Sequence, residues 1–373
     1  MLLRNTTAYL DHTFKSSTDI RLQAGRIAEI GSSLPLFPGE ELFDCAGDYV
    51  IPGFVDVHIH AFRGNDAMHG EPAVRTMARD LRAEGVAAFC PTTMSASEED
   101  TLLAMSGIRA VRLHPGEGEA LVIGAHMEAP FLSEKKAGAQ RKEFFTDPSL
   151  QALQRMTGGH LEDARLLTMA PERAGAESFI RQATAAGLII SLGHTAAPAE
   201  LVHQAGDWGA NHITHTFNAQ TPLNHREPGV PGAALTDDRF YTEMICDGIH
   251  LHRDTIRLIA RAKGSDKTVV ITDAMEAAGM PDGEYSLGGQ KVFVREGAAR
   301  LADGTLAGSV LLMRVALQNL IHRFDISPED AVRMCTETPA DSVDEKTLGR
   351  LLPGAPAPVT RWTRDWAFVS VLG

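Results

Sequence analysis

Eight apolar, strand-like runs alternate with helix-like stretches along the middle of the chain, and this alternation limits the possible fold more than any other feature. The helix-like stretches include residues 73–83, 176–186 and 254–262. Eight buried strands with intervening helices are typical of a (β/α)8 barrel. A doubly wound open sheet is the competing architecture, but no Gly-x-Gly-x-x-Gly motif follows a strand, and eight strands would be many for that class. The eight runs cover residues 49–60, 86–92, 120–128, 165–170, 188–194, 212–217, 241–250 and 268–273.

Both ends of the chain predict short strands outside this alternation. Residues 18–25 alternate apolar and polar side chains, and residues 26–31 follow them as a hairpin partner would. The C-terminal residues 358–372 are also typical of strands. We therefore expect a small β-sandwich domain that is built from residues 1–50 and 345–373.

The predicted α/β protein thus has a TIM-like barrel over residues 51–344. A segment rich in glycine and in alternating residues, near 283–308, predicts a β-hairpin insertion after the eighth strand. Residues 309–324 then predict an amphipathic helix.

The charge of the chain limits its partners. It carries 35 Lys and Arg against 48 Asp and Glu, a formal net charge of −13, which argues against a nucleic-acid-binding protein. A small anionic substrate remains compatible with this charge, because local groups and any bound metal set the field of a site. With 44% hydrophobic residues, the chain can bury a sizeable core.

No feature of the sequence predicts a membrane or secreted protein. No apolar run approaches the roughly 20 residues that span a bilayer, and Arg4, Asp11 and His12 interrupt the start of the chain where a signal peptide would be apolar. The cysteines are far apart and form no Cys-x-x-Cys pair, so we expect reduced thiols in a cytoplasmic protein. They are Cys45, Cys90, Cys246 and Cys335.

Histidines and acidic residues stand at the ends of six of the predicted strands. Because the C-terminal ends of parallel barrel strands meet at one mouth, these side chains should converge there. Residues two apart in a strand project to the same side, so His58 and His60 could bind one ion while Ile59 points away. Several imidazoles with a carboxylate suit Zn²⁺ or Fe²⁺ and are poorly suited to Mg²⁺ or Ca²⁺. The strand-end residues are His58, His60, Glu128, His194, His215, His250 and Asp273.

The other histidines are interpreted as surface or structural residues, because a single histidine is more often hydrogen-bonded or exposed than a metal ligand. His126 and His212 lie in or near strands but not at their ends, and we expect both to be structural. For the strand-end set the metal interpretation is favoured, because burying so many polar groups without partners is costly. The remaining histidines with the surface or structural interpretation are His12, His69, His114, His160, His203 and His322.

Seven sequence blocks resemble the amidohydrolase superfamily and, more closely, its N-acetylglucosamine-6-phosphate deacetylase family. The resemblance runs from about residue 51 to residue 313, and the TDAM…PDG and REPG blocks are its most specific parts. A later stretch, GTLAGSV at 304–310, also matches. The blocks are VIPGFVDVHIH (50–60), GAHMEAP (124–130), SLGHT (191–195), THTFNA (214–219), HREPG (225–229), DGIH (247–250) and TDAMEAAGMPDG (272–283).

The resemblance implies a divalent metal centre. Glu128, His194 and His215 would hold the main catalytic ion, and His58 and His60 a second or alternative position. We therefore expect one or two ions in each subunit, with Zn²⁺ preferred and Fe²⁺ as the alternative. Asp273 would be the general base and then the general acid.

The resemblance also implies a substrate site and a homodimer. His250, Asn218, the backbone of Ala219 and Arg226 would position a sugar phosphate, with the arginine coming from the neighbouring subunit. A guanidinium group offers the planar fork that suits a phosphate. The alternative is that Arg226 is an ordinary exposed arginine.

The implied reaction is the deacetylation of N-acetylglucosamine 6-phosphate to glucosamine 6-phosphate and acetate, with a metal-activated water as the nucleophile. Two alternatives remain open. One is the same chemistry on another N-acyl amino sugar, such as N-acetylgalactosamine 6-phosphate. The other is a non-catalytic barrel that binds sugar phosphates, against which Asp273 argues, because a structural metal site needs no additional carboxylate at the mouth.

The sequence departs from the family pattern in three places. It has Glu-Ala-Pro where the family has Glu-Gly-Pro, and Pro-Ala-Pro-Val at 356–359 where the family has Ala-Asp-Leu-Val. Residues 135–140 read Lys-Lys-Ala-Gly-Ala-Gln, so that Gln140 replaces a histidine thought to polarise the substrate carbonyl. We expect Gln140 to contact the substrate as a hydrogen-bond donor without positive charge, which makes oxyanion stabilisation weaker or differently aimed.

Overall fold

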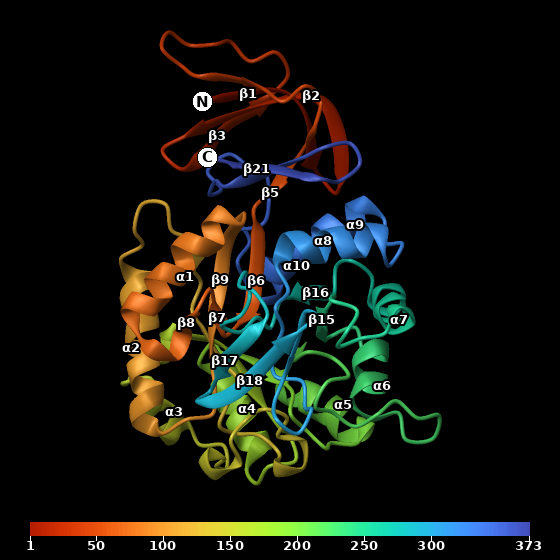
Figure 1. Ribbon diagram of the computed structural model, residues 1–373. Coiled ribbons are helices and arrows are strands. Elements are labelled where there is room, and N and C mark those ends of the chain that lie inside the picture. The colour runs from red at the N-terminus through yellow and green to blue at the C-terminus, as the bar shows by residue number, and fades with distance from the viewer.

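The computed structural model describes all 373 residues, Met1–Gly373, as a barrel with a separate sheet beyond one of its ends (Figure 1). The barrel strands are parallel, and each pairs with the next one along the chain. The ring closes where Ile59 bridges Ala274 and the N–H of Asp273 donates to the carbonyl oxygen of His58 at 2.9 Å. This confirms the predicted barrel. Its strands are β6 (Phe54–Ile59), β9 (Val86–Thr93), β11 (Ala125–Met127), β12 (Ala164–Met169), β13 (Ile189–Leu192), β14 (His212–Ile213), β15 (Tyr241–Ile245) and β16 (Thr268–Ile271).

The helices surround the barrel because each has one apolar face. The helix α1 (Glu71–Ala83) buries Val74, Met77, Ala78 and Leu81, which follow the three- and four-residue spacing of a helix face. These faces and the strands form one core of 76 buried residues. The other helices are α2 (Glu98–Leu113), α3 (Leu150–Met156), α4 (Ala176–Ala185), α5 (Ala199–Trp208), α6 (Gly229–Thr236), α7 (Arg253–Lys263), α8 (Met313–His322), α9 (Pro328–Cys335) and α10 (Glu337–Ser342), with short 3₁₀ turns η1 (Ala67–His69), η2 (Glu134–Lys136), η3 (Lys142–Phe144) and η4 (Leu161–Asp163).

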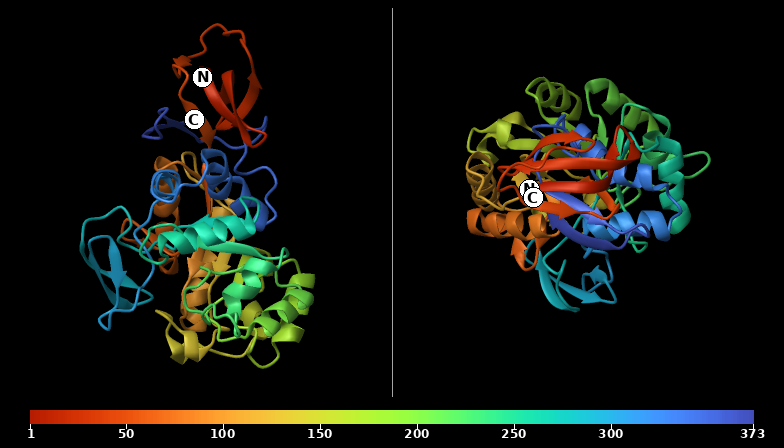
Figure 2. Two further views of the ribbon diagram at one scale, coloured as in Figure 1. Left: turned by 90° about the vertical axis from the view of Figure 1, so that its right-hand side faces the viewer. Right: turned by 90° about the horizontal axis from the view of Figure 1, so that it is seen from above.

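The two ends of the chain build the separate sheet together, as expected (Figure 2). Its strand order is β21-β20-β5-β1-β2-β3, with β4 beside β1, so C-terminal strands lie against N-terminal ones. A core of its own, 12 buried residues, lies within this sheet. The strands are β1 (Leu2–Leu10), β2 (Thr13–Gln23), β3 (Arg26–Gly31), β4 (Leu42–Asp44), β5 (Tyr49–Pro52), β20 (Val359–Trp362) and β21 (Phe368–Leu372).

The predicted insertion is a three-stranded antiparallel sheet of β17 (Gly283–Leu287), β18 (Gln290–Arg295) and β19 (Ala298–Arg300). It carries a small core of 8 buried residues and lies beside the barrel (Figure 1). A two-stranded ribbon, β7 (Ala61–Phe62) and β8 (Asn65–Asp66), follows β6. None of the helices combines the length and apolar character required to cross a bilayer.

Several predicted strands are shorter or divided. The run predicted at 49–60 forms β5 in the terminal sheet and β6 in the barrel, separated at Gly53. A Cβ atom at Gly53 would lie 2.8 Å from both Ala87 Cβ and the Pro358 carbonyl oxygen, so only glycine fits where the chain passes between the two sheets. The run at 120–128 forms β10 (Leu121–Val122) and β11, and the run at 241–250 ends as a strand at Ile245.

Candidate metal and substrate site

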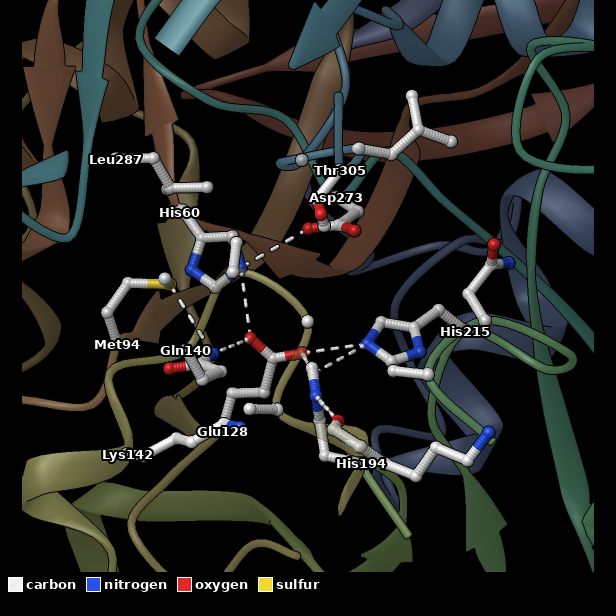
Figure 3. A pocket seen from close by; sticks show the side chains of 18 of the residues that line it. His60, Met94, Glu128, Gln140, Lys142, His194, His215, Asp273, Leu287 and Thr305 are labelled. Carbon is white, nitrogen blue, oxygen red and sulfur yellow. Dashed lines mark hydrogen bonds and ion pairs between the residues drawn. The ribbon is translucent and has the colours of Figure 1, made fainter. Parts of the chain in front are cut away.

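The strand-end residues surround a cavity of about 440 Å³ at the C-terminal mouth of the barrel (Figure 3). Nine of the eleven predicted site residues line this cavity. Of the other two, His58 lies fully buried among the lining residues, and Arg226 lies outside the cavity. The nine are His60, Glu128, Gln140, His194, His215, Asn218, Ala219, His250 and Asp273.

Glu128, His194 and His215 form one group of potential ligands, although they come from three different strand ends. Glu128 Oε1 lies 3.2 Å from His194 Nε2 and 3.0 Å from His215 Nε2. The two imidazole nitrogens are 3.1 Å apart. All three donor atoms therefore point at one small volume, as ligands of a single ion would.

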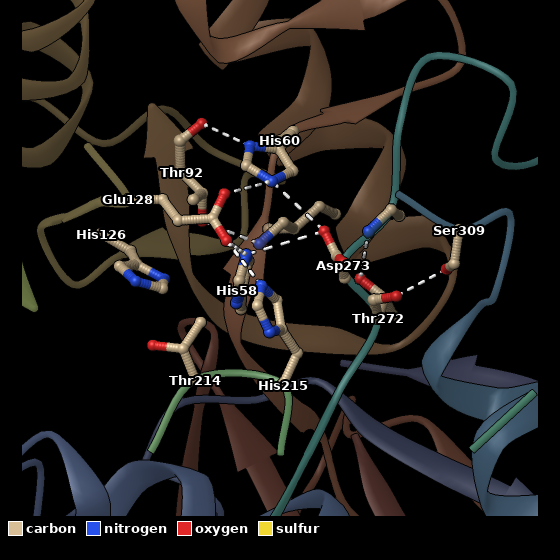
Figure 4. A network of polar contacts seen from close by, with 12 residues as sticks. His58, His60, Thr92, His126, Glu128, Thr214, His215, Thr272, Asp273 and Ser309 are labelled. Carbon is tan, nitrogen blue, oxygen red and sulfur yellow. Dashed lines mark hydrogen bonds and ion pairs between the residues drawn. The ribbon is translucent and has the colours of Figure 1, made fainter. Parts of the chain in front are cut away.

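His58, His60 and Asp273 form a second group next to the first (Figure 4). His60 Nε2 lies 3.2 Å from Asp273 Oδ1, and His58 Nε2 lies 3.6 Å from the same oxygen. Glu128 connects the groups, because its Oε1 lies 3.4 Å from His58 Nε2 and its Oε2 lies 3.2 Å from His60 Nε2. The carboxylate of Glu128 is thus placed between two potential ion positions.

The hydrogen bonds at Nδ1 of these imidazole rings indicate that a cation fits between their Nε2 atoms and the carboxylates. His60 Nδ1 lies 3.2 Å from the Thr92 carbonyl oxygen and His194 Nδ1 lies 2.9 Å from that of Lys136. A carbonyl oxygen only accepts hydrogen bonds, so Nδ1 carries the proton and a neutral ring presents a lone pair at Nε2. Lone pairs that face carboxylate oxygens repel each other unless positive charge lies between them. A divalent ion supplies that charge, and second-sphere bonds of this kind are typical of metal-binding histidines.

The shifted pKa values of the cluster also indicate that positive charge is stabilised there. Burial lowers the pKa of His60, but hydrogen bonds with Asp273 and Glu128 outweigh it and raise the pKa to about 9. Burial raises the pKa of Glu128, but the positive charge of His58 and the hydrogen bond with His194 outweigh it and hold this pKa well below its usual range. The carboxylates at the mouth therefore favour any nearby cation, whether a proton or a metal ion.

Four of the residues at the mouth have an uncommon backbone conformation. His194, His215, Ala219 and Asp273 have positive φ angles of 45°, 27°, 50° and 50°. Side chains other than glycine rarely adopt this region, and such residues cluster at functional sites. Here the left-handed residues end the strands early and turn the chain at the mouth.

Asp273 is held firmly at its position. Asp56 is fully buried, and its Oδ2 accepts from Thr272 Oγ1 at 2.5 Å, which fixes the residue before Asp273. The Asp273 carbonyl oxygen accepts from the N–H of Ser309 at 2.7 Å. Its side-chain Oδ2 makes no hydrogen bond or ion pair within the chain, and the residue lines the cavity. One carboxylate oxygen is therefore free to exchange a proton at the mouth.

The other wall of the cavity offers further hydrogen-bonding groups. His250 Nδ1 lies 2.7 Å from Asp247 Oδ2, which orients the ring and leaves its Nε2 without a partner in the chain. Burial lowers the pKa of His250, but the hydrogen bond with Asp247 outweighs it and raises the pKa. Asn218 lines the cavity, and the N–H of the adjacent Ala219 donates to no group of the chain. Polar atoms from the loops that follow β14 and β15 are thus available to a ligand.

Gln140 lines the cavity, but its amide is already engaged. Its Oε1 accepts from the N–H of Ser95 at 2.7 Å, and its Nε2 donates to Glu128 Oε2 at 2.6 Å. The same Nε2 also lies 3.5 Å from Met94 Sδ, so both N–H groups of the amide have partners within the chain.

Arg226 does not reach the cavity of its own chain. It lies in an exposed loop before α6, together with Leu223, Asn224, His225 and Glu227, and it makes no ion pair or hydrogen bond. Its predicted role in phosphate binding depends on a second subunit.

Two sets of residues at this site were not predicted. Lys135, Lys136 and Lys142 line the cavity and give positive charge to its rim, which the net charge of the whole chain conceals. Glu243, in the middle of β15, lies fully buried and contacts His58. A charged residue inside a run that is predicted to be a buried strand was the available signal.

Comparisons with known proteins identify the family of the chain. A sequence model of the amidohydrolase family matches residues 49–371. The chain is 32% identical over 365 residues to an N-acetylglucosamine-6-phosphate deacetylase from Lysinibacillus sphaericus. The aligned region covers 95% of this chain and 91% of the relative. The chain is also 35% identical over 314 residues to an N-acetylgalactosamine-6-phosphate deacetylase from Escherichia coli O157:H7. This alignment covers 84% of this chain and 83% of the relative.

A solved structure is similar over the whole chain. It is that of a mutant N-acetyl-D-glucosamine-6-phosphate deacetylase from Mycobacterium smegmatis in complex with N-acetyl-D-glucosamine-6-phosphate. The two share a TM-score of 0.91 and 30% identity, and the match covers 100% of this chain and 97% of that one. The similarity extends over both the barrel and the terminal sheet.

Proposed function

Because the chain belongs to the amidohydrolase family, we propose that it hydrolyses the amide bond of N-acetylglucosamine 6-phosphate and releases acetate and glucosamine 6-phosphate. The observation that carries the proposal is the convergence of Glu128, His194 and His215 on one volume beside Asp273. These three residues would hold a divalent ion, which would make water a nucleophile near neutral pH and would polarise the substrate carbonyl. The donor set favours Zn²⁺, with Fe²⁺ as the alternative.

The residues of the chain then perform the proton transfers. The free oxygen of Asp273 accepts a proton from the attacking water, whose oxygen forms a bond to the acetyl carbon. Asp273 then donates this proton to the sugar nitrogen as the C–N bond breaks. The amine leaves as glucosamine 6-phosphate and the acyl group as acetate, so one carboxylate serves as base and then as acid.

The substrate is positioned by groups on the other wall of the cavity. His250 Nε2, Asn218 and the free N–H of Ala219 can donate to sugar hydroxyls or to the phosphate. We propose that the partner subunit's Arg226 binds the phosphate in a homodimer, which is supported by the exposed loop that carries this residue. The lysines at the rim add to the attraction of the phosphate. The four cysteines are buried and free, which supports a reducing, cytoplasmic location.

N-Acetylgalactosamine 6-phosphate is the second candidate substrate, because one relative carries that activity in its name. The position of Gln140 leaves the choice open, since its amide nitrogen donates to Glu128 and to Met94 Sδ and not to a substrate group. A non-catalytic sugar-phosphate-binding barrel is a weaker alternative, because the free oxygen of Asp273 has no structural function.

A substrate panel tests the proposal. Acetate release is measured with both N-acetylated hexosamine 6-phosphates and both unphosphorylated sugars, on protein of known metal content. We expect N-acetylglucosamine 6-phosphate to give the highest kcat/KM. A higher kcat/KM for the galactosamine compound would establish the second candidate, and no acetate release from any compound by metal-loaded protein would contradict the proposed reaction.

A further inference from the structure

A group of buried polar side chains lies beneath the metal cluster and is not used in the proposed mechanism. Glu243 from β15, His126 from β11 and His212 at the start of β14 are all fully buried. The His126 ring packs against the His58 ring at 4.4 Å between centroids (Figure 4). Of these three residues, only Glu243 is bonded directly to candidate metal ligands.

One oxygen of Glu243 contacts both ligand groups. Its Oε2 lies 2.9 Å from His58 Nδ1 and accepts from the backbone N–H of His215 at 2.9 Å. His58 belongs to the group with His60 and Asp273, and His215 belongs to the group with Glu128 and His194. A single buried carboxylate therefore fixes the position of a ligand in each group.

This contact determines which nitrogen of His58 faces the ion. A carboxylate only accepts, so His58 Nδ1 carries the proton and Nε2 presents its lone pair. Nε2 is fully buried and makes no hydrogen bond in the chain. The atoms nearest to it are acidic oxygens, Glu128 Oε1 at 3.4 Å and Asp273 Oδ1 at 3.6 Å. An unpartnered nitrogen in this position is accounted for when it is a metal ligand.

His58 also differs from its neighbours in the kind of partner that orients it. His60 and His194 donate to backbone carbonyl oxygens, whereas His58 donates to a side-chain carboxylate. A carboxylate orients the ring and also makes it more electron-donating, and loss of such a partner typically costs about 10- to 100-fold in metal affinity.

The same cluster could instead be an ion site, because donor atoms of His58, His126 and Glu243 lie within 4.8 Å of one another. The hydrogen bonds favour the positioning role. His126 Nε2 is bonded to Thr168 Oγ1 at 2.7 Å, and that hydroxyl continues to Thr214 Oγ1 at 2.7 Å. Glu243 Oε2 already accepts two N–H groups. A third ion would have to displace His58 from the contact that orients it.

We propose that Glu243 is a positioning residue for the metal centre, which holds His58 so that an ion is bound at the His58–His60 position in addition to the one at Glu128, His194 and His215. The proposal rests on the proposed function in that it assigns ions to the same cluster. It adds the residue on which binding of the second ion depends.

The test is metal binding by Glu243→Gln, which has the same shape but neither the charge nor the full accepting capacity of a carboxylate. Zn²⁺ and Co²⁺ are titrated into chelator-treated protein, and bound metal is measured by elemental analysis and by the visible spectrum of Co²⁺. We expect wild type to bind two ions. Glu243→Gln should bind the first normally, because the amide oxygen can still accept from the His215 N–H, and the second about 10- to 100-fold more weakly, because the charge that acts on His58 is lost.

Matched variants separate positioning from general damage. Asp163→Asn removes another buried carboxylate at the far end of the barrel and should bind both ions as wild type does. His58→Asn should lose the second ion by itself, and adding Glu243→Gln to it should weaken binding no further, because the two side chains act through one contact. If Glu243→Gln does not fold, Glu243→Asp, which keeps the charge but is one methylene shorter, should show the same selective loss.

Three results would overturn the proposal: normal affinity for both ions in Glu243→Gln, a single ion in wild type, or a third ion that disappears with Glu243. Acetate release is measured on the same samples. Wild type that binds two ions without releasing acetate would contradict the proposed function and leave Glu243 its role. If wild type releases acetate while Glu243→Gln binds both ions normally, the proposed function stands and the proposed role of Glu243 is contradicted.

Discussion

The two ends of the barrel both bury carboxylates, but they surround them with different partners. At the N-terminal end, Asp163 accepts from Arg109 Nη1 at 2.6 Å and from Arg112 Nε at 2.9 Å, so its charge is neutralised within the chain. At the mouth, Glu128 pairs with no lysine or arginine and faces four imidazoles instead. At the mouth, the ligand candidates His194 and His215 also have positive φ angles. The carboxylate at the N-terminal end is neutralised by arginines of the chain, whereas the carboxylate at the mouth has no such partner and favours a bound cation.

This difference separates stability from activity along the barrel axis, which is a general property of TIM barrels. Substitutions at the mouth should change metal binding and catalysis, and those at the opposite end should change the free energy of unfolding. Each of the following predictions tests that separation.

The largest effect should come from Asp273→Asn. Asparagine cannot take a proton from water, so kcat should fall by about 10²- to 10⁴-fold. The ion at Glu128, His194 and His215 should still bind, because Asp273 does not belong to that ligand group. Steady-state acetate release and elemental analysis check both statements. A kcat near that of wild type would show that Asp273 is not the proton carrier.

At the opposite end, Asp163→Asn should lower the free energy of unfolding by about 3 kcal/mol, because the buried carboxylate loses its partly buried charge-assisted hydrogen bonds with Arg109 and Arg112, which remain. Urea unfolding measures this loss. The kcat of the folded variant should be unchanged, and a large fall in kcat would contradict the separation of the two ends.

Arg226→Ala should reduce kcat/KM for the phosphorylated substrate by about 10- to 100-fold, mainly through KM, because hydrogen bonds to a charged group are lost. Activity on the unphosphorylated sugar should not change. Arg261→Ala, which removes another exposed arginine, is the control. An unchanged preference for the phosphorylated substrate would restore the interpretation of Arg226 as an ordinary surface residue.

The smallest effect concerns acid stability away from the mouth. Hydrogen bonds from Arg239, and then from His203, hold the pKa of Asp237 well below its usual range. A lowered folded-state pKa adds stability above the unfolded value of about 3.9, and this stability is lost as the pH falls further. The difference in unfolding free energy between wild type and Asp237→Asn should therefore shrink below pH of about 4. A difference independent of pH would contradict this assignment.

Much of the barrel could be predicted from the sequence, because each strand is a nearly continuous apolar run that ends in a polar residue. The spacing of His58 and His60 predicted that both would face one side, and the structure brings both to Glu128. The exact residues at which the strands stop could not be predicted. The chain turns at His194, His215 and Asp273 through left-handed backbone angles, which these residue types rarely adopt.

Tertiary contacts explain what the sequence did not reveal. Nothing local indicates that Gln140 donates to Glu128, because Ser95 fixes its amide from a distant part of the chain. The division of the run at 49–60 follows from the close approach of Pro358 to Gly53 across the two sheets. Glu243 was overlooked because its partner His58 is 185 residues away in the sequence.

The central claim is that the mouth of the barrel binds the cation that its own residues lack. Anomalous diffraction from crystals of zinc-loaded protein tests this most directly. We expect a peak about 2.0–2.2 Å from His194 Nε2, His215 Nε2 and a Glu128 oxygen. A zinc-loaded crystal without a peak there, or with its ion bound only elsewhere, would contradict the claim.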